Sequence, residues 1–309
     1  MLNLRYQAGG KSFILPRQCS TGERSMRMSE RPASRNKIRV AMAGLDRLRV
    51  TAIALSAMIL AQGSGWTWGR IGHEVSSKLA QERLTPAALA AVRTLLGAGV
   101  SLSDASAWAD SQPEVPDSGP WHYVNVPLSE SRYDARFCQP GGCVVSKIED
   151  FKRVLLDPRA GKTAKQQALR FLIHFIEDLH QPLHIGDTGS RGGNLIQVRF
   201  FDAGSNLHQV WDSLIIEHHS GNENVWLWEL NGLANPKMVA EWSKGNPEDW
   251  ATESLAEARL AYRTPGGDAL VRSGAKLGND YCNFALPIIR RQLAKSGVRV
   301  AATLNAIFK

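Results

Sequence analysis

The chain lacks a stretch of about 20 apolar residues, the length that an α-helix needs to cross the hydrocarbon core of a bilayer. Its apolar run at residues 50–61 is only about a dozen residues long. The sequence also lacks internal repeats and low-complexity tracts. With 309 residues, 43% of them hydrophobic, it can still build a substantial core. These features indicate a globular protein of one large domain or two ordinary ones.

Most of the chain also lacks net charge. The formal charge of the whole sequence is +8, but residues 1–67 contain 11 Lys/Arg and only 3 Asp/Glu. The remaining residues contain 26 basic and 26 acidic side chains. The positive charge therefore belongs to the N-terminal segment, and it does not indicate that the folded part binds nucleic acid.

This N-terminal segment has the pattern of a signal peptide. Arg47 and Arg49 precede the apolar run at 50–61, and small residues follow it. An uncleaved signal anchor is the alternative. We expect residues 1–67 to be a leader and signal peptide outside the mature fold. The mature protein is then predicted to be secreted or periplasmic.

Within the leader, residues 1–40 are predicted to be poorly structured, and Met42 is one possible true start. The chain has no N-x-Ser/Thr sequon, so N-glycosylation is not expected. This absence favours a bacterial exported protein over a fungal one.

Cysteine is scarce, with four residues in all. Cys138 and Cys143 lie in the tight loop CQPGGC, which suits a local disulfide in an exported protein. A zinc-binding pair is the alternative, although the chain has no second cysteine pair to complete a four-thiolate site. Cys19 lies in the leader, and Cys282 is predicted to be a buried structural thiol.

The folded part is predicted to be all-α, a mainly helical single domain at residues 68–309 with a small β-hairpin. The run LIQVRFF at 195–201 has the residue types of a strand. Residues 121–126 are predicted to be extended, and Ser205 or Asn206 to cap the following helix. Helical patterns occupy residues 73–97, 101–109, 144–156, 165–181 and about 286–308.

The stretch FLIHFIEDLHQPLH at 171–184 contains the clearest chemical signal. His174 and Asp178 are four residues apart, so a helix places them on one face. Their neighbours are apolar, and a charge buried there needs compensation. Pro182 is predicted to end the helix and to leave His184 on a loop. Imidazole and carboxylate in an apolar setting are typical zinc ligands; a helix with one polar face in water is the alternative.

A second helix repeats the arrangement with His208 and Asp212. His73 in GH, Asp110 in WAD and His122 after Trp121 add further candidate ligands. Since a catalytic zinc usually takes three protein ligands and leaves one position open, these residues suffice for more than one zinc ion.

Several motifs resemble those of one family. They are WGRIGH at 68–73, WAD at 108–110, WHYVNV at 121–126, the C-x4-C loop, RFLIHFIEDLHQPLH at 170–184, GGN at 192–194 and NLHQVWD at 206–212. With their order and spacing, the chain resembles the S1/P1 nucleases over residues 68–309. These are single-strand-specific nucleases and 3′-nucleotidases with three Zn²⁺ ions, and their fold is shared with zinc phospholipase C.

The resemblance implies three ligand sets, in which Asp178 bridges the first two ions. Trp68 would contribute the free α-amine and carbonyl oxygen of a processed N-terminus. His180, His218 and His219 match no ligand position. The implied sets are Asp110, His122, His174 and Asp178 for the first zinc; Trp68, His73 and Asp178 for the second; and His184, His208 and Asp212 for the third.

The resemblance also implies substrate contacts. Asp110 would orient the attacking water, and Asn194 would lie near the phosphate as a further catalytic group. Tyr123 occupies a base-stacking position, with a core tyrosine as the alternative. Asn125 stands where the family has an acid that contacts the base. The implied products are 5′-phosphorylated nucleotides and oligonucleotides.

Two further departures from the family pattern stand out. Ser111, Gln112 and Pro113 follow WAD, where the family usually has an arginine that helps to hold phosphate. Cys282 also lacks the partner found in some members.

Two alternatives remain. One is a zinc-dependent phospholipase C, although Asp212 fills a position that is Glu in those enzymes. The other is a secreted zinc-binding protein that has lost turnover. The expected partners are single-stranded DNA and RNA and 3′-nucleotides, with no stable protein partner and no membrane after signal cleavage.

Overall fold

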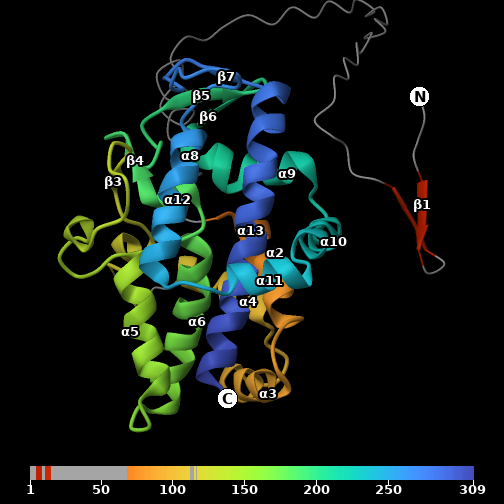
Figure 1. Cartoon of the computed structure of the whole chain (residues 1–309), viewed down its shortest axis with the longest axis vertical. Helices are drawn as coiled ribbons and strands as arrows, with labels where there is room; N and C mark the ends of the chain where they lie inside the picture. The colour runs from red at the N-terminus through yellow and green to blue at the C-terminus, as the bar shows by residue number, and fades with distance from the viewer. Residues whose placement is uncertain (1–4, 9–10, 15–67, 112–114, 116) are drawn as a thin grey trace, which may run out of the picture. The chain divides into compact units, whose positions relative to one another are not determined.

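The computed structural model in Figure 1 describes residues 5–8, 11–14, 68–111, 115 and 117–309. Strands β1 (Arg5–Ala8) and β2 (Lys11–Ile14) pair in antiparallel register, with Arg5 opposite Ile14. We expected no regular structure here. The predicted signal sequence at 50–61 lies outside the described residues.

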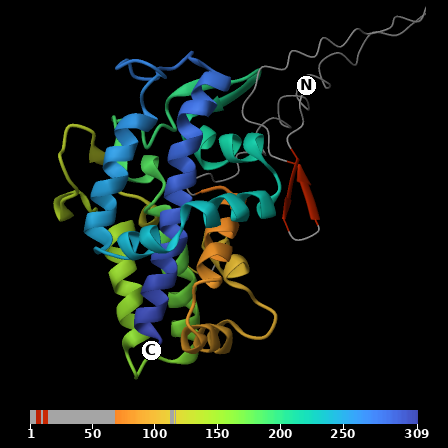
Figure 2. The same cartoon turned by 45° about the vertical axis from the view of Figure 1, so that its right-hand side comes forward.

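From Trp68 onward the chain is mainly helical, which confirms the predicted fold class. Figures 1 and 2 show the long helix α13 running through the body, with α5 and α6 side by side. The helices are α2 (Arg70–Gln81), α3 (Pro86–Leu96), α4 (Leu102–Ser106), α5 (Val144–Leu156), α6 (Lys162–Asp178), α7 (Pro182–Ile185), α8 (Leu207–Gln209), α9 (Ile215–His219), α10 (Glu223–Leu233), α11 (Pro236–Trp242), α12 (Pro247–Ala261) and α13 (Asn279–Ile307). None of the helices in the described part of the chain is both long and apolar enough to cross a membrane.

The described strands of the body are short. The predicted hairpin consists of β5 (Gln197–Phe200) and β6 (Ala203–Asn206), and β7 (Lys276–Leu277) joins β5 in parallel. A second pair joins β3 (Val126–Pro127) to β4 (Gly186–Asp187) in parallel. This pair brings the segment after His122 beside the segment after His184.

Several predicted boundaries were wrong. Residues 73–97 form two helices rather than one, because Thr85 caps a new helix that has Pro86 at its first position. Residues 101–109 form α4 and then a 3₁₀ turn at Ala109–Ser111. Residues 121–126 are extended only in part: a 3₁₀ turn covers Gly119–His122, Tyr123 has an extended backbone, and β3 begins at Val126.

Two helix starts also differ. His184 lies on the short helix α7 rather than on a loop, because Pro182 occupies its first turn and the Gln181 side chain accepts a hydrogen bond from Leu183 N. The last helix begins at Asn279 and continues through Pro287, which sequence reasoning placed at its start. The predicted cap Asn206 is confirmed, since its side chain accepts a hydrogen bond from Gln209 N.

Helix α6 lies in the core. Its second half, from Phe171 to Asp178, is buried on all sides. Phe171 stacks on Phe151 of α5 at 4.9 Å between ring centroids and meets Trp108 edge-on at 5.3 Å. Burial of each large apolar side chain contributes about 1.5–3 kcal/mol. This packing holds the polar end of α6 in a fixed position.

The predicted disulfide between Cys138 and Cys143 is confirmed. It closes the loop before α5, whose first residue is Val144. Cys282 is buried in the core, as predicted.

Candidate metal centre

The predicted ligands converge at the C-terminal end of α6. His174 and Asp178 lie on this helix, His73 on α2 and His184 on α7. Their side chains are fully buried. Asp110 differs, because 29% of its side chain is exposed. The centre is therefore closed on most sides and open at Asp110.

One carboxylate oxygen of Asp178 faces the first group of histidines. Asp178 Oδ2 lies 2.9 Å from His174 Nε2 and 2.9 Å from His122 Nδ1. These two nitrogens are 3.0 Å apart. Asp110 Oδ1 lies 3.4 Å from His174 Nε2. Asp178, His122 and Asp110 thus all place a possible ligand atom within 3.4 Å of His174 Nε2.

The other oxygen of Asp178 faces different histidines. Asp178 Oδ1 lies 3.5 Å from His73 Nε2 and 3.5 Å from His184 Nδ1. A carboxylate whose two oxygens point toward separate nitrogen groups has the arrangement of a bridging ligand. The bridging role of Asp178 between two metal ions stays a prediction.

The third predicted set forms a group of its own. Asp212 Oδ2 lies 3.1 Å from His208 Nε2, and Asp212 Oδ1 lies 3.8 Å from His184 Nε2. The rings of His184 and His208 stack at 5.1 Å. Asp212 lies on a π-helical turn at Val210–Leu214, which follows α8. Such turns occur frequently at functional sites.

Trp68 is anchored beside the same centre. Its side chain is fully buried, and its indole Nε1 donates a hydrogen bond to Glu177 O at 3.0 Å. The next residue, Gly69, donates its N–H to Asp212 O at 2.8 Å. A Cβ at Gly69 would lie 2.1 Å from Ser213 Oγ. The backbone at Trp68 is therefore held between the elements that carry Asp178 and Asp212.

Several buried polar atoms of the centre have no hydrogen-bond partner among the described residues. Leaving one such atom unsatisfied costs about 1–3 kcal/mol. Bound metal ions would satisfy all of them together, so the residues fit a metal centre. The atoms are His73 Nε2, Asp178 Oδ1, both ring nitrogens of His184, His208 Nε2 and Asp212 Oδ2.

Three groups of side chains in the described residues could each hold a metal ion. In each group the possible ligand atoms all lie within 4.8 Å of one another. The groups are His73, Asp110 and His174; His122, His174 and Asp178; and His184, His208 and Asp212.

Neighbouring acceptors orient the imidazoles. His174 Nδ1 donates to Ser106 O at 2.6 Å, and His208 Nδ1 donates to Gly192 O at 2.7 Å. A carbonyl oxygen can only accept, so each Nδ1 donates its proton, and each Nε2 is the nitrogen that faces the centre and can bind a metal ion once it carries no proton. His73 Nδ1 lies 2.7 Å from the buried carboxyl of Glu177. A histidine held by a carboxylate in this way is a typical metal ligand.

The electrostatics favour cations. Burial opposes the charged form of His174, but the carboxylates of Asp178 and Asp110 outweigh it and raise the pKa of His174 to about 10. Burial lowers the pKa of His184 to about 4. A metal ion that binds at His174 therefore competes with a proton, whereas His184 is already neutral.

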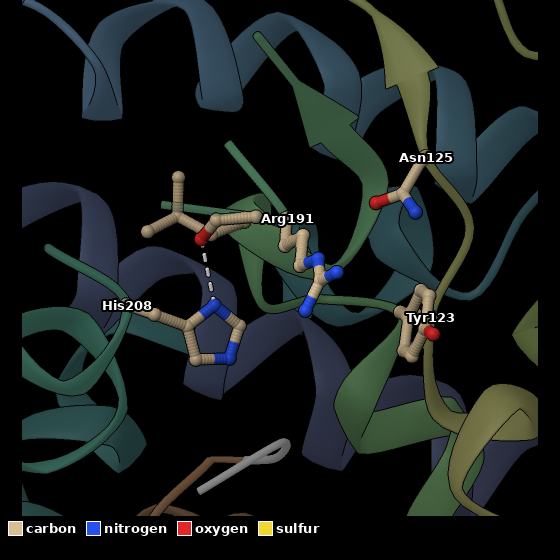
Figure 3. A pocket seen from close by; sticks show the side chains of 6 residues that line it. Tyr123, Asn125, Arg191 and His208 are labelled. Atoms are coloured by element: carbon tan, nitrogen blue, oxygen red, sulfur yellow. Dashed lines mark hydrogen bonds between the residues drawn. The ribbon is translucent and has the colours of Figure 1, made fainter. Parts of the chain in front are cut away.

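A cavity of about 320 Å³ opens beside the third group (Figure 3). Tyr123 and Asn125, both predicted substrate contacts, line it together with His208. The N–H of Val124 donates to His184 O at 2.7 Å and holds this segment against α7. The remaining lining residues are Leu183, Arg191 and Gly192.

Asn194, the predicted phosphate contact, lies on the turn that follows Arg191. Its side-chain amide donates to Arg191 O at 2.9 Å. Sequence reasoning missed both Arg191 and Glu177. A carboxylate next to Asp178 inside an apolar helix was a usable signal for Glu177, whereas no spacing pointed to Arg191.

The three histidines without a predicted ligand role lie elsewhere. His180 Nε2 accepts a hydrogen bond from the buried Arg299 at 2.8 Å. His219 Nε2 lies 3.0 Å from a carboxylate oxygen of Glu229. His218 packs on the ring of Phe201 at 4.5 Å.

The helical fold and the clustered histidines and carboxylates define the class, that of a mainly helical protein whose buried side chains could hold metal ions. Comparison with known proteins then identifies the family. The family model described as S1/P1 Nuclease matches residues 68–309. The chain belongs to this family, whose members are nucleases and therefore hydrolases.

Curated relatives agree with this membership. The chain is 34% identical to Endonuclease 2 of Arabidopsis thaliana over 270 residues, 78% of this chain and 90% of that protein. It is 30% identical to Nuclease P1 of Penicillium citrinum, covering 78% of this chain and 97% of the relative. It is 27% identical to Nuclease S1 of Aspergillus oryzae, covering 84% and 98%.

Proposed function

We propose that the protein is a zinc-dependent phosphodiesterase that cleaves single-stranded DNA and RNA to 5′-phosphorylated products and also acts as a 3′-nucleotidase. The main support is the convergence of His73, His174 and His184 on the two oxygens of Asp178, with buried ligand atoms left unsatisfied. Membership of a nuclease family supports the reaction class.

We propose three Zn²⁺ ions. The first would be held by Asp110, His122, His174 and Asp178, and the third by His184, His208 and Asp212. The second would take His73, Asp178 and the terminal amine and carbonyl oxygen of Trp68. The buried position of Trp68 beside Glu177 and Asp212 supports its role as a terminal ligand.

Bound zinc ions would acidify water and neutralise charge on the phosphate. The chain's own groups would then position the reactants. Asp110 is exposed, whereas the other candidate ligands are buried. It is therefore the proposed acceptor that orients the attacking water. Tyr123 would stack on a base in the cavity beside His208. Asn125 would contact the edge of the same base, and Asn194 remains a proposed polar group near the phosphate.

Stacking in the cavity also supports the preference for single strands. A ring such as that of Tyr123 can stack only on a base that is not already stacked and paired in a duplex. The half-buried Tyr123 and the exposed Asn125 are both accessible from the cavity.

We propose that the mature protein comprises residues 68–309 and is secreted or periplasmic. An amide nitrogen is not basic, so Trp68 can bind zinc through its nitrogen only after residues 1–67 have been removed. N-terminal sequencing of the exported protein tests this step, and a terminus at Ser64 or Gly65 would contradict the second zinc site.

The reaction itself is tested by comparing two substrates on the same zinc-loaded preparation. We expect release of acid-soluble nucleotides from single-stranded DNA and RNA and no release of phosphocholine from phosphatidylcholine. Phosphocholine release alone would replace the nuclease with a phospholipase C. Three bound zinc ions without either activity would indicate a zinc-binding protein without turnover.

A further inference from the structure

We propose that Arg191 binds the anionic phosphate of the nucleotide in the cavity beside His208. This inference rests on the proposed function and assigns a residue that neither the motifs nor the spacing indicated. The arginine expected after Asp110 is absent, since Ser111 follows it.

Arg191 is placed for this role. Its side chain extends into the cavity between His208 and Tyr123 (Figure 3). It has the only permanently charged side chain among the described residues that line this cavity. Within the part of the chain that the structure describes, its guanidinium has no hydrogen bond or ion pair. A cation without a protein partner in a cavity is available to an anionic ligand.

The backbone of Arg191 is fixed by a hydrogen-bonded turn. Its φ of 55° lies in the left-handed region, which non-glycine residues rarely adopt. The carboxylate of Asp187 accepts hydrogen bonds from Ser190 N and Gly192 N, both at 3.0 Å. The amide of Asn194 donates to Arg191 O. Such a conformation persists only where the surroundings impose it, and it is frequent at ligand-binding positions.

The same turn is joined to the proposed third zinc site. Gly192 O accepts the proton of His208 Nδ1 at 2.7 Å. Gly192 also has a positive φ of 62°, and a Cβ there would lie 2.5 Å from Leu183 O. The backbone at Arg191 is thus held in a fixed position relative to His208.

The chemistry of the guanidinium fits a phosphate. It is always charged, and its planar fork can donate two parallel hydrogen bonds to two phosphate oxygens. A phosphate held at the third metal group would share this cavity with Arg191. Arg191, on the turn before β5, would in this way take the role of the arginine that is absent after Asp110.

The test compares binding of deoxyadenosine 5′-monophosphate and of deoxyadenosine to zinc-loaded protein by calorimetry. We expect Arg191→Met to weaken binding of the monophosphate by about tenfold to a hundredfold while nucleoside binding stays unchanged. Arg191→Lys should retain part of the affinity, because it keeps the charge but loses the fork. Zinc content should equal that of the wild type in both variants.

Arg272→Met is the matched control. Arg272 is exposed and lies outside the cavity, and its replacement removes the same charge. The affinities for the monophosphate and for the nucleoside should therefore stay at the wild-type values. Monophosphate binding within twofold of wild type in Arg191→Met would overturn the proposal, as would an equal loss for the nucleoside. A wild-type protein that does not bind the monophosphate would also overturn it. Phosphate-dependent binding that needs Arg191, without cleavage of single-stranded DNA, would instead contradict only the proposed function.

Discussion

At the scale of single residues, the centre depends on the candidate ligands and also on the neighbouring side chains that orient them. Glu177 shows this most clearly. It is fully buried, lies 2.7 Å from His73 Nδ1 and accepts a hydrogen bond from Ser77 Oγ at 2.6 Å. Burial raises the pKa of this carboxyl well above its usual range. A metal ion bound at His73 would favour the ionised form of Glu177, which would then accept the proton of His73 Nδ1 and orient the ring.

Replacing Glu177 with Gln should weaken zinc binding at the site that includes His73. The amide can still accept the proton of His73 Nδ1, but it removes the charge, so we expect an affinity about tenfold to a hundredfold lower for one zinc ion. Zinc titration with a competing chelator measures this. Glu217→Gln, on the exposed surface of α9, is the matched control and should bind zinc like the wild type. Equal affinities for Glu177→Gln and the wild type would show that Glu177 has no orienting role.

The sequence indicated the candidate ligands but not the residues that hold them in place. His174 and Asp178 were found because four-residue spacing fixes a shared helix face. Glu177 was not singled out, because an acid next to Asp178 points to another face of the helix and contacts His73 only through the tertiary packing of α2 on α6. Arg191 depends on a left-handed turn, which local sequence does not specify for an arginine.

At the scale of elements, the turn from Asp187 to Asn194 connects the cavity to the metal centre. Gly192→Ala would force a side chain against Leu183 O and into a positive φ. We expect the free energy of unfolding to fall by about 1–3 kcal/mol. We also expect loss of the third zinc, because Gly192 O would no longer be placed to accept the proton of His208 Nδ1. Metal analysis of the purified variant measures the second effect.

Gly204→Ala in β6 is the control for this change. Nothing lies within 4 Å of a Cβ at Gly204, and its φ is not positive, so zinc content should be unchanged. If Gly192→Ala keeps all of the zinc found in the wild type, the turn does not position His208.

Helix α13 is held to its neighbours by a buried arginine. Arg299 is 2% exposed and donates to Glu253, to Trp242 O at 3.0 Å and to His180 Nε2 at 2.8 Å. Its guanidinium also lies over the ring of Trp250 at 5.0 Å. No pattern in the sequence indicated this network, since its members come from four separate segments.

Arg299→Met should lower the free energy of unfolding by about 2–3 kcal/mol, because it leaves His180 Nε2 and Trp242 O without a donor. The loss is smaller than for a fully buried ion pair, since 40% of the Glu253 side chain is exposed. Urea unfolding measures it. The neighbouring Arg291→Met removes a more exposed pair with Glu257 and should cost less than about 1 kcal/mol. Similar losses in the two variants would contradict a special role for Arg299.

At the scale of the whole molecule, the sequence predicted the class of fold and most of the helices. The helix at Val144–Leu156 has the predicted bounds, since its apolar spacing has no competing signal. The predicted helix boundaries were wrong where a cap and a proline start a new helix, as at Thr85 and Pro86. They were also wrong where a helix continues through a proline, as at Pro287. The meeting of α2, α6, α7 and α8 at one centre could be expected only from the family resemblance, because spacing along a chain does not specify which helices pack together.

The central claim is that the centre around Asp178 binds zinc and cleaves single-stranded nucleic acid. The most direct measurement is release of acid-soluble nucleotides from single-stranded DNA by protein that begins at Trp68, before and after removal of zinc with a chelator. We expect rapid cleavage, its loss on chelation, its return when zinc is added, and slower cleavage of a duplex. Protein that holds three zinc ions and leaves single-stranded DNA and RNA intact would contradict it.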